Sequence, residues 1–463
     1  MSVKTKGFKR DAIRNFRQFI NLTQTVFLRS VGLDIIEGQR LGVHMWDVES
    51  DEKFIDCFCS AGSFNVGRRN PDILETLEDS IDNWDMGDYK FLSAPRAALA
   101  EKLVSVAPEG LNSAMLCVGG GEANDSALKM ARGVTGKKKV ISLVKAYHGH
   151  TGFSLSAIGK PVYRDPFEPL IPGFTHEPPI NDINAVRSLA DDDTAAIILE
   201  LVQGEAGIFC AEQDFVENLR KLCDEKGIML IFDEVQTGLG RTGKFFCCEH
   251  YNVFPDILTV AKSLGGSLYP ISAVLYNDKT RKFLEDNPGI MESTSGGSDL
   301  GSIVGCASID YLLKNNVPEH AARMGDYIGD AILRLADKHE GLLKEVRRKG
   351  LMIGLQYTHD MMGPLMSYYL GRNGVMAIFS ANNPKVMRLM PPIVINQEEA
   401  DRLITALDRS MASVKRASKI VDFADRIPIV SKAIAIQEVQ ISLIFTFKNI
   451  ISILPKTNRC CGK

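Results

Sequence analysis

Short apolar runs alternate with amphipathic stretches through the middle of this chain, and this alternation limits the folds that the chain can adopt. The apolar runs are strand-like and cover residues 113–118, 139–144, 195–201, 229–232, 257–261 and 271–275. Helical spacing marks residues 122–132 and 214–226. Near-continuous apolar strands separated by helices indicate a mostly parallel sheet that is covered on both faces. We therefore expect an α/β fold in which helices sandwich a large central sheet.

Polar residues stand where three of these apolar runs end. Glu200 lies near the end of one run, Asp233 directly follows another, and Lys262 follows a third. Ligands bind to sheets of this kind beyond the carboxyl ends of the strands. The sequence therefore predicts a site at that edge of the sheet.

The two flanks of the chain differ from its middle and predict a small α+β domain built from both chain ends. The pattern indicates a hairpin in residues 42–56, mostly helix in 315–349, a strand in 388–395 and a helix in 397–414. The expected divisions are an N-terminal segment of the small domain (1–70), a large domain (71–320), the C-terminal part of the small domain (321–415) and an apolar extension (416–463).

Charge and cysteine usage exclude several classes of function. The net charge is −3 with both signs interspersed, so no nucleic-acid partner is expected. The ten cysteines include no C-x-x-C pair and have no histidine at metal-finger spacing, which indicates free thiols and no metal site. Residues 1–17 lack the apolar core of a signal peptide, and no run of ~18 apolar residues is present. We therefore expect a cytoplasmic protein.

A carboxylate and a lysine about thirty residues apart suggest a cofactor. Asp233 ends an apolar strand and precedes a Gly-rich turn, and Lys262 lies between an apolar run and two glycines. Alone, each has an ordinary explanation: a solvated acidic turn, or a surface lysine. Together they suit pyridoxal phosphate (PLP), which needs a lysine for its Schiff base and a carboxylate against its ring nitrogen.

A Gly-rich turn can hold the phosphate of such a cofactor. Residues 118–121 read Val-Gly-Gly-Gly and lie between a strand and a strong helix. The start of a helix offers unpaired N–H donors and a positive dipole end to an anion. A merely flexible turn explains the glycines equally well, so the position after a strand gives the motif its weight.

These segments resemble the class III, or ω-type, PLP-dependent aminotransferases, a family that includes ornithine and acetylornithine aminotransferases. The resemblance runs from about Asp56 to about Arg409. It is carried by residues 233–238 (Asp-Glu-Val-Gln-Thr-Gly) with 240–243 (Gly-Arg-Thr-Gly), Lys262, 146–149 (Ala-Tyr-His-Gly), 200–207 (Glu-Leu-Val-Gln-Gly-Glu-Ala-Gly), Ser293-Thr294 and Arg388 before Pro391-Pro392. The resemblance implies a fold-type-I architecture and PLP as the cofactor.

The resemblance also implies a role for each matching residue. The catalytic residues would be Lys262, as the Schiff-base lysine, and Asp233, against the ring nitrogen. The other cofactor-binding residues would be Gly120 and Gly121 (phosphate), Tyr147 (stacked on the ring), His148 of the same segment, Val235 (beneath the ring), Gln236 (ring hydroxyl) and Thr294 (phosphate of the neighbouring subunit's cofactor). The substrate-binding residues would be Arg388, for a carboxylate, and Glu205, which neutralises Arg388 when an amine occupies that pocket. The role of Thr294 implies an obligate homodimer with active sites at the interface.

Some of these residues have alternative interpretations. The Tyr147-His148-Gly149 segment could be an ordinary strand-end turn, and Arg388 could be a salt-bridged strand residue. We interpret Glu200 as a structural carboxylate rather than a participant in the reaction.

The expected reaction is transfer of an amino group from an amine or amino-acid donor, with an ω-amine favoured, to a 2-oxo acid such as 2-oxoglutarate. A PLP-dependent racemase, epimerase or aminomutase on the same fold is the alternative, and a non-catalytic PLP-fold module is a third. Glu205 together with Arg388 favours a transaminase, because such an enzyme must accept two different substrates in one pocket.

The chain departs from the family pattern in ways that bear on its substrate. The phosphate turn and the late loop (293–299) lack usual side chains, and Leu201 replaces a proline. Ala61 stands where ornithine-specific members carry a tyrosine, which counts against plain ornithine transamination and suggests a specialised substrate.

Residues 427–455, beyond the resemblance, are unusually apolar, but their uninterrupted runs are too short to span a membrane. We favour an additional packing element. An interfacial membrane anchor, a partner-binding segment and an aggregation-prone extension are the alternatives.

Overall fold

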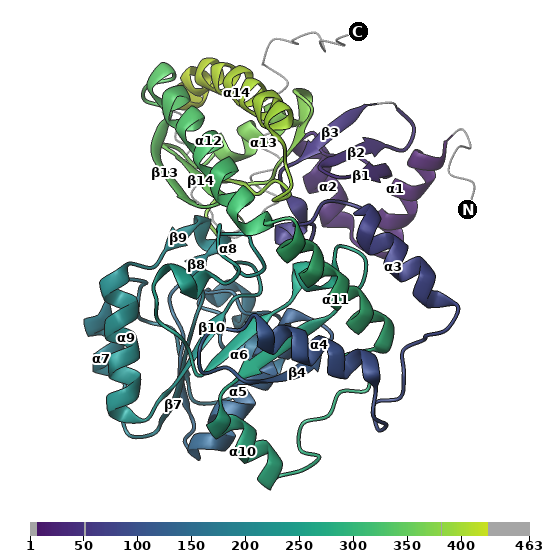
Figure 1. Ribbon diagram of the computed structural model, residues 1–463. Helices are drawn as coiled ribbons and strands as arrows, with labels where there is room; N and C mark the ends of the chain where they lie inside the picture. The colour runs from purple at the N-terminus through teal and green to yellow at the C-terminus, as the bar shows by residue number, and fades with distance from the viewer. Residues whose placement is uncertain (1–6, 51, 381, 425–463) are drawn as a thin grey trace.

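The computed structural model of the chain describes residues 7–50, 52–380 and 382–424. Its lower half in Figure 1 is built on a seven-stranded sheet, and smaller sheets lie in the upper half. The strand order of the large sheet is β4 (Ser113–Cys117), β12 (Ser272–Tyr276), β11 (Ile257–Val260), β10 (Met229–Asp233), β7 (Thr194–Leu199), β5 (Lys139–Ile141) and β6 (Phe174–Thr175). Only β12 within this sheet runs antiparallel to its neighbours, which confirms the mostly parallel sheet.

Both faces of the large sheet are buried, which explains the continuous apolar runs. Along β10, Leu230 and Phe232 belong to one hydrophobic cluster, whereas Met229 and Ile231 belong to a second. Successive side chains of a strand point to opposite faces, so the two clusters lie on the two sides of the sheet. An amphipathic strand would leave one of these faces in water.

Helices cover both faces of this sheet. The helices in residues 71–314 are α3 (Pro71–Ile81), α4 (Ala94–Ser105), α5 (Gly120–Thr135), α6 (Gly152–Ser156), α7 (Ile183–Leu189), α8 (Gly204–Gly207), α9 (Gln213–Lys226), α10 (Asp278–Asp286) and α11 (Asp299–Lys314), of which α3 packs on α11 rather than on the sheet. Helix α5 packs across β7, β11 and β12. Helix α9 ends at Gly227, whose φ of 60° is the left-handed conformation that glycine adopts at little cost.

The smaller sheets bring the two ends of the chain together. Strands β1 (Glu37–Leu41), β2 (His44–Asp47) and β3 (Lys53–Asp56) are extended by β15 (Val375–Met376), which pairs with β3 in parallel. A second sheet contains β13 (Leu343–Lys349), β14 (Met352–Tyr357) and β16 (Val386–Leu389). The helices of this half are α1 (Phe8–Phe19), α2 (Leu22–Ser30), α12 (Val317–Lys338), α13 (Met362–Arg372) and α14 (Gln397–Ala424). The domain divisions at residues 70, 320 and 415 remain a prediction.

Some predicted elements are shorter than expected. Residues 315–349 are mostly helical, as predicted, but α12 ends at Lys338, and the residues of β13 pair antiparallel with β14. The charged residues of β13 have good helix propensity, but pairing with a buried neighbouring strand overrides that preference. The strand expected over residues 139–144 stops at Ile141.

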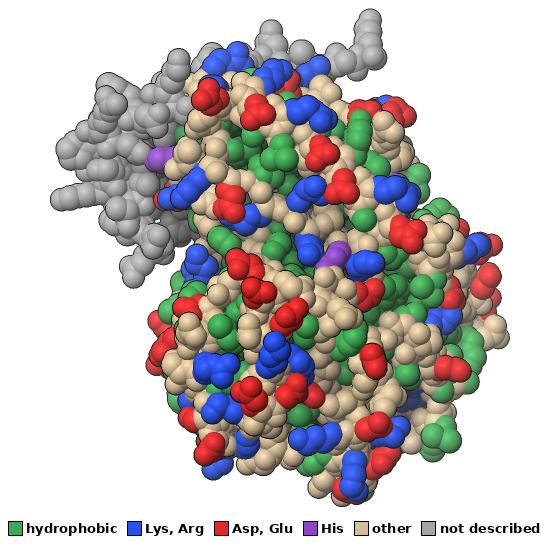
Figure 2. Space-filling view, turned by 60° about the vertical axis from the view of Figure 1, so that its left-hand side comes forward, with side chains coloured by type: hydrophobic (Ala, Val, Ile, Leu, Met, Phe, Trp, Pro, Cys, Tyr) green, Lys and Arg blue, Asp and Glu red, His purple; other side chains and the backbone are tan. Residues whose placement is uncertain are grey.

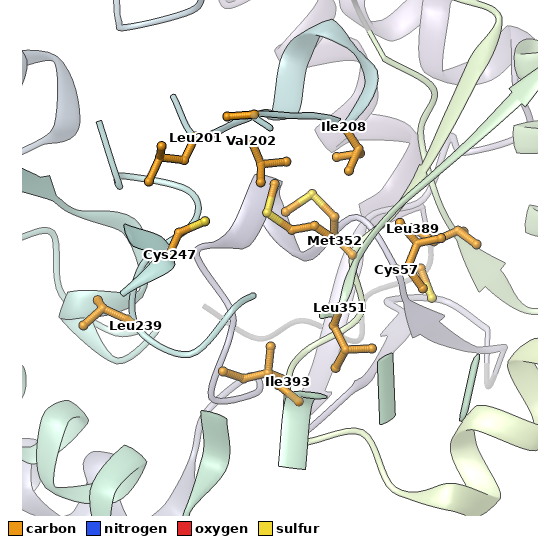
Figure 3. Packing of buried hydrophobic residues seen from close by; sticks show 14 of the residues in the cluster. Cys57, Leu201, Val202, Ile208, Leu239, Cys247, Leu351, Met352, Leu389 and Ile393 are labelled. Atoms are coloured by element: carbon orange, nitrogen blue, oxygen red, sulfur yellow. The ribbon is translucent and has the colours of Figure 1, made fainter. Parts of the chain in front are cut away.

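An apolar seam joins the two halves of the molecule. Figure 3 shows buried side chains from the chain ends, among them Cys57, Leu351 and Ile393, in one cluster with Val202 and Leu239 from the middle. This packing fixes the small sheets against the carboxyl edge of the large sheet.

On the face seen in Figure 2, acidic and basic side chains are interspersed. No helix within the described residues has the length and apolarity needed to cross a bilayer. The apolar extension after residue 424 lies outside the described residues, so the interpretation of that segment stays a prediction.

Candidate active site

A cavity of about 520 Å³ opens at the carboxyl edge of the parallel strands. The loops that follow β4, β5, β7, β10 and β11 all reach it, because these strands run in the same direction. Asp233 and Lys262 both line this cavity. A single bound cofactor can contact both residues only if they face one cavity, as they do here. Other residues of its wall include Gly120, Gly121, Tyr147, His148, Glu200, Glu205, Val235 and Gln236.

Asp233 is held by hydrogen bonds on both carboxylate oxygens. Its Oδ2 accepts from Asn124 Nδ2 at 2.8 Å and lies 2.7 Å from His148 Nδ1. Its Oδ1 accepts from the backbone N–H of Val235 at 3.0 Å. The residue is 4% exposed, so these bonds replace water around a buried anion. The arrangement presents a fixed negative charge to the cavity.

Lys262 follows β11 in a strained backbone conformation. Its φ of 46° lies in the left-handed region, which is uncommon for residues other than glycine and recurs at functional sites. Burial lowers the pKa of the Lys262 amine, while the charges of Glu205 and Asp233 act in the opposite direction. A lowered pKa increases the share of neutral, nucleophilic amine.

The Gly-rich turn forms a close-fitting cradle at the start of α5. A Cβ atom on Gly120 would lie 2.8 Å from Val235 Cγ1, and one on Gly149 would lie 2.8 Å from the Cα atom of Gly121. Larger residues therefore cannot stand at these positions without displacing the wall. The first amides of a helix have no acceptor within the helix, so they can bind an anion here.

Gln236 contributes a buried acceptor that lacks a donor. Its Nε2 donates to the carbonyl of Ala61 at 2.9 Å, whereas its Oε1 has no hydrogen-bond partner among the described residues. A Cβ atom on Gly204 would lie 1.6 Å from this oxygen, so the glycine leaves room for the amide. A buried amide oxygen without a donor fits a ligand hydroxyl.

The Tyr147 ring stands edge-on to two other aromatic rings. The centroid of His150 lies 5.4 Å away and that of Tyr163 lies 6.1 Å away, at steep interplanar angles. Burial, followed by the charge of Glu205, raises the pKa of Tyr147 to about 12. The ring therefore stays neutral near pH 7.

Glu200 accepts hydrogen bonds from the backbone around the cavity. Its Oε1 accepts from the N–H of Tyr147 at 2.9 Å and its Oε2 from the N–H of Gly204 at 3.3 Å. Burial raises the pKa of Glu200 to about 7. These contacts support the interpretation of Glu200 as a structural carboxylate that positions the tyrosine loop.

Glu205 lines the cavity and forms an ion pair with Arg388 of β16, which is not itself a wall residue. Arg388 Nη1 lies 2.5 Å from Glu205 Oε1, although the two residues are 183 positions apart in the chain. Arg388 is 4% exposed, and its Nε has no partner among the described residues. The ion pair agrees with the alternative in which Arg388 is a salt-bridged strand residue. It is also the contact that the neutralising role of Glu205 requires.

Thr294 is exposed, and other residues form the cavity wall of its own chain. It lies in the loop between α10 and α11. The structure therefore does not bring Thr294 to the other predicted site residues within one subunit.

The sequence interpretation missed several residues of the site. Asn124 bonds to Asp233, and Ser63, Phe64 and residues 267–271 line the cavity. One sequence signal could have indicated Asn124, because it is a polar residue near the apolar helix positions Ala123 and Ala127 and would therefore be buried. In the part of the chain that the structure describes, no group of three or more His, Cys, Asp or Glu side chains could hold a metal ion.

Comparison with known proteins identifies the family. Residues 31–411 match the model for class-III aminotransferases. The chain belongs to this family. An uncharacterized aminotransferase of Archaeoglobus fulgidus is 39% identical over 415 residues, which cover 90% of this chain and 97% of that protein.

Solved structures agree with this assignment. The ornithine aminotransferase of Toxoplasma gondii has a TM-score of 0.83 at 26% identity, and the match covers 90% of this chain and 96% of that one. The (S)-enantioselective ω-transaminase of Thermomicrobium roseum has a TM-score of 0.80 at 26% identity, covering 89% and 100%. The class III aminotransferase therefore has the fold-type-I architecture that the sequence predicted.

The class III aminotransferase is PLP-dependent, and the Toxoplasma structure is described with PLP at its active site. The cavity residues fit this cofactor. The glycine cradle suits its phosphate, the carboxylate of Asp233 suits its ring nitrogen, and the unpaired Gln236 Oε1 suits its ring hydroxyl.

Proposed function

We propose that this aminotransferase moves an amino group from an ω-amine donor to a 2-oxo acid such as 2-oxoglutarate. The observation that carries the proposal is the ion pair between Glu205 and Arg388 at the cavity. A guanidinium binds a carboxylate in a bidentate fork, which suits the acceptor. The amine-bearing end of an ω-amine donor has no carboxylate, so an unpaired arginine would oppose it. Glu205 cancels that charge while the donor is bound.

The other site residues would serve both halves of the reaction. PLP, when bound, withdraws electrons from the amine-bearing carbon of the substrate, so that a proton there becomes removable. Lys262 would move that proton, and its lowered pKa favours the neutral base. Asp233 would face the ring nitrogen, the amides of Gly120 and Gly121 would hold the phosphate, and Gln236 Oε1 would accept from the ring hydroxyl. Tyr147, His148 and Val235 would enclose the ring.

The relatives support an ω-amine donor. They are named ornithine aminotransferase, acetylornithine aminotransferase and ω-transaminase. Ala61 lies in the loop that carries the cavity residues Ser63 and Phe64, and its small side chain argues for a donor other than ornithine.

We also propose a homodimer with active sites at its interface. A segment before α4 leaves large apolar side chains exposed: Trp84, Met86, Tyr89, Phe91 and Leu92. An exposed apolar segment of this size marks an interaction surface. The loop that carries Thr294 lies beside this segment, because Lys90 Nζ bonds to Glu292 at 2.6 Å. A second copy seated here would bring Thr294 near the partner's cofactor phosphate.

A cytoplasmic location is part of the same proposal. The eight cysteines within the described residues are free thiols, as expected in a reducing compartment.

The decisive experiment is a panel of amino donors with 2-oxoglutarate and pyruvate as acceptors. The panel contains ornithine, N-acetylornithine, lysine, 4-aminobutyrate, putrescine and α-amino acids. We expect an ω-amine donor to give the highest kcat/KM, with stoichiometric formation of the amino acid derived from the acceptor. The same donor without acceptor should bleach the visible absorbance of the bound cofactor. Inversion of an α-amino acid without consumption of any 2-oxo acid would instead support the racemase or epimerase alternative.

A further inference from the structure

We infer that Thr259 and Asn124 act as positioning residues, which fix the orientation of Asp233 and of His148. They do so through a hydrogen-bond relay in which Thr259 donates to Asn124, and Asn124 donates to Asp233 and to the backbone of His148. This inference rests on the proposed role of Asp233 toward the ring nitrogen of the cofactor. It adds two residues that lie outside the motifs of the sequence.

The relay joins three elements of the large domain. The parallel register of β10 and β11 places Asp233 directly beside Thr259. Asn124 lies in the first turns of α5, which packs across β11. Thr259 Oγ1 donates to Asn124 Oδ1 at 2.7 Å, and the exposed fractions of the two residues are 0% and 1%. Water cannot substitute for either partner.

The direction of the relay follows from its chemistry. An amide oxygen only accepts, so the hydroxyl of Thr259 must donate to it. The Nδ2 of Asn124 then faces two acceptors, Asp233 Oδ2 and the carbonyl of His148, each at 2.8 Å. The reversed amide would set its oxygen against both of these acceptors. Unpaired buried polar groups are costly, so these two acceptors select the orientation of the amide, and Thr259 supplies the donor that the amide oxygen then needs.

The relay leaves a defined oxygen for the cofactor. Oδ2 of Asp233 is occupied by Asn124 and His148, whereas Oδ1 accepts only from the N–H of Val235 among the described residues. Oδ1 is therefore the oxygen with capacity for the ring nitrogen. The carboxylate also requires His148 to donate from Nδ1, and Asn124 holds the backbone of the same histidine.

A threonine substitution tests the relay. Thr259→Val keeps the shape of the side chain and removes the donor, whereas Thr259→Ser keeps the donor. We expect Thr259→Val to weaken PLP binding to the apoprotein about tenfold, the worth of one net hydrogen bond, and to lower kcat by a similar factor with little change in the donor KM. Thr259→Ser should restore both quantities to near the wild-type values.

Thr280→Val is a matched control. Thr280 is also fully buried and its hydroxyl also donates to an asparagine Oδ1, that of Asn277 at 3.0 Å, but it lies in α10 and is not a cavity residue. This variant should lose stability without loss of PLP affinity. Equal losses of PLP affinity in Thr280→Val and Thr259→Val would overturn the relay, as would a Thr259→Ser variant as defective as Thr259→Val.

A second variant keeps the inference testable if Thr259→Val does not fold. Asn124→Asp keeps the shape but replaces the donor with an acceptor beside Asp233. We expect PLP affinity to fall further than in Thr259→Val, and unchanged affinity would refute the relay. Asp233→Asn distinguishes a failure of the relay from a failure of the proposed role of Asp233. A normal Asp233→Asn variant would reject the proposed role of Asp233, whereas a defective Asp233→Asn with a normal Thr259→Val would reject the relay alone.

Discussion

At the Asp233 end of the cavity three hydrogen-bond donors converge on one carboxylate, whereas at the other end the Glu205 carboxylate bonds to one nitrogen of Arg388. The first end is built from the neighbouring strands β10 and β11 of the large sheet and from helix α5, which packs on that sheet. The second joins the short helix α8 (Gly204–Gly207) to β16. A buried carboxylate held by three donors resists rearrangement, while a single ion pair can exchange partners. The fixed end suits a permanent cofactor, and the exchangeable end suits two successive substrates.

Lys262 lines the same cavity, and its loss should have the largest effect on the reaction. We expect Lys262→Ala to abolish measurable turnover, because no other described residue of the cavity wall carries an amine. PLP can still bind through the phosphate cradle and Asp233. Turnover is measured by formation of the amino acid from the acceptor, and PLP content by absorbance after gel filtration. Normal turnover in this variant would contradict the assignment of Lys262.

The fixed end is tested by Asp233→Asn. The substitution removes the charge that we propose faces the ring nitrogen, so we expect kcat to fall by ~10²-fold or more for every donor. The effect should be the same in both half-reactions, because the cofactor takes part in both. A loss confined to one half-reaction, measured by single-turnover kinetics, would show that this end also discriminates between substrates.

The exchangeable end should divide its effects between the substrates. Arg388→Lys keeps the positive charge but loses the bidentate fork, so we expect the KM for the 2-oxo acid to rise about tenfold. Glu205→Gln should instead raise the KM for the ω-amine donor, because Arg388 keeps its charge without a counter-ion. Steady-state kinetics with each substrate varied in turn measures both values. Equal effects of both variants on both substrates would break the proposed division.

The smallest expected effect is on stability and concerns the buried carboxyl of Glu200, which bonds to the backbone of Tyr147. Its pKa of about 7 lies above the ordinary value of 4.5, so the folded protein holds this proton to higher pH than the unfolded chain does. The stability contributed by this proton is complete below pH 4.5 and is lost as pH rises through 7. Glu200→Gln should therefore flatten the fall in the free energy of unfolding across this window. Denaturant unfolding from pH 5 to 8 measures the slope, and Glu75→Gln, at an exposed position, is the control.

The sequence was sufficient to predict the fixed end because its motifs are local. Asp233 ends a continuous apolar strand, Lys262 follows another, and the glycines precede a strong helix, so each could be placed by its neighbours in the chain. Asn124 and Thr259 could not be placed in the same way. Their contact depends on the register between β10 and β11 and on how α5 crosses them, which no local pattern encodes.

The errors have the same origin. The charged strand β13 has the composition of a helix, and only its pairing with β14 makes it extended. Thr294 is exposed and is not a wall residue of the cavity in its own chain, so its role stays a prediction.

The pairing of β15 with β3 has a consequence for biosynthesis. The ribosome completes all strands of the large sheet by residue 276, but residues 375–376 that cover the edge of β3 emerge a hundred residues later. During that interval β3 offers open backbone groups to other nascent chains, as exposed sheet edges do. The half that carries Asp233 and Lys262 can thus form early in translation, while the half that carries Arg388, the proposed acceptor-binding residue, is completed later.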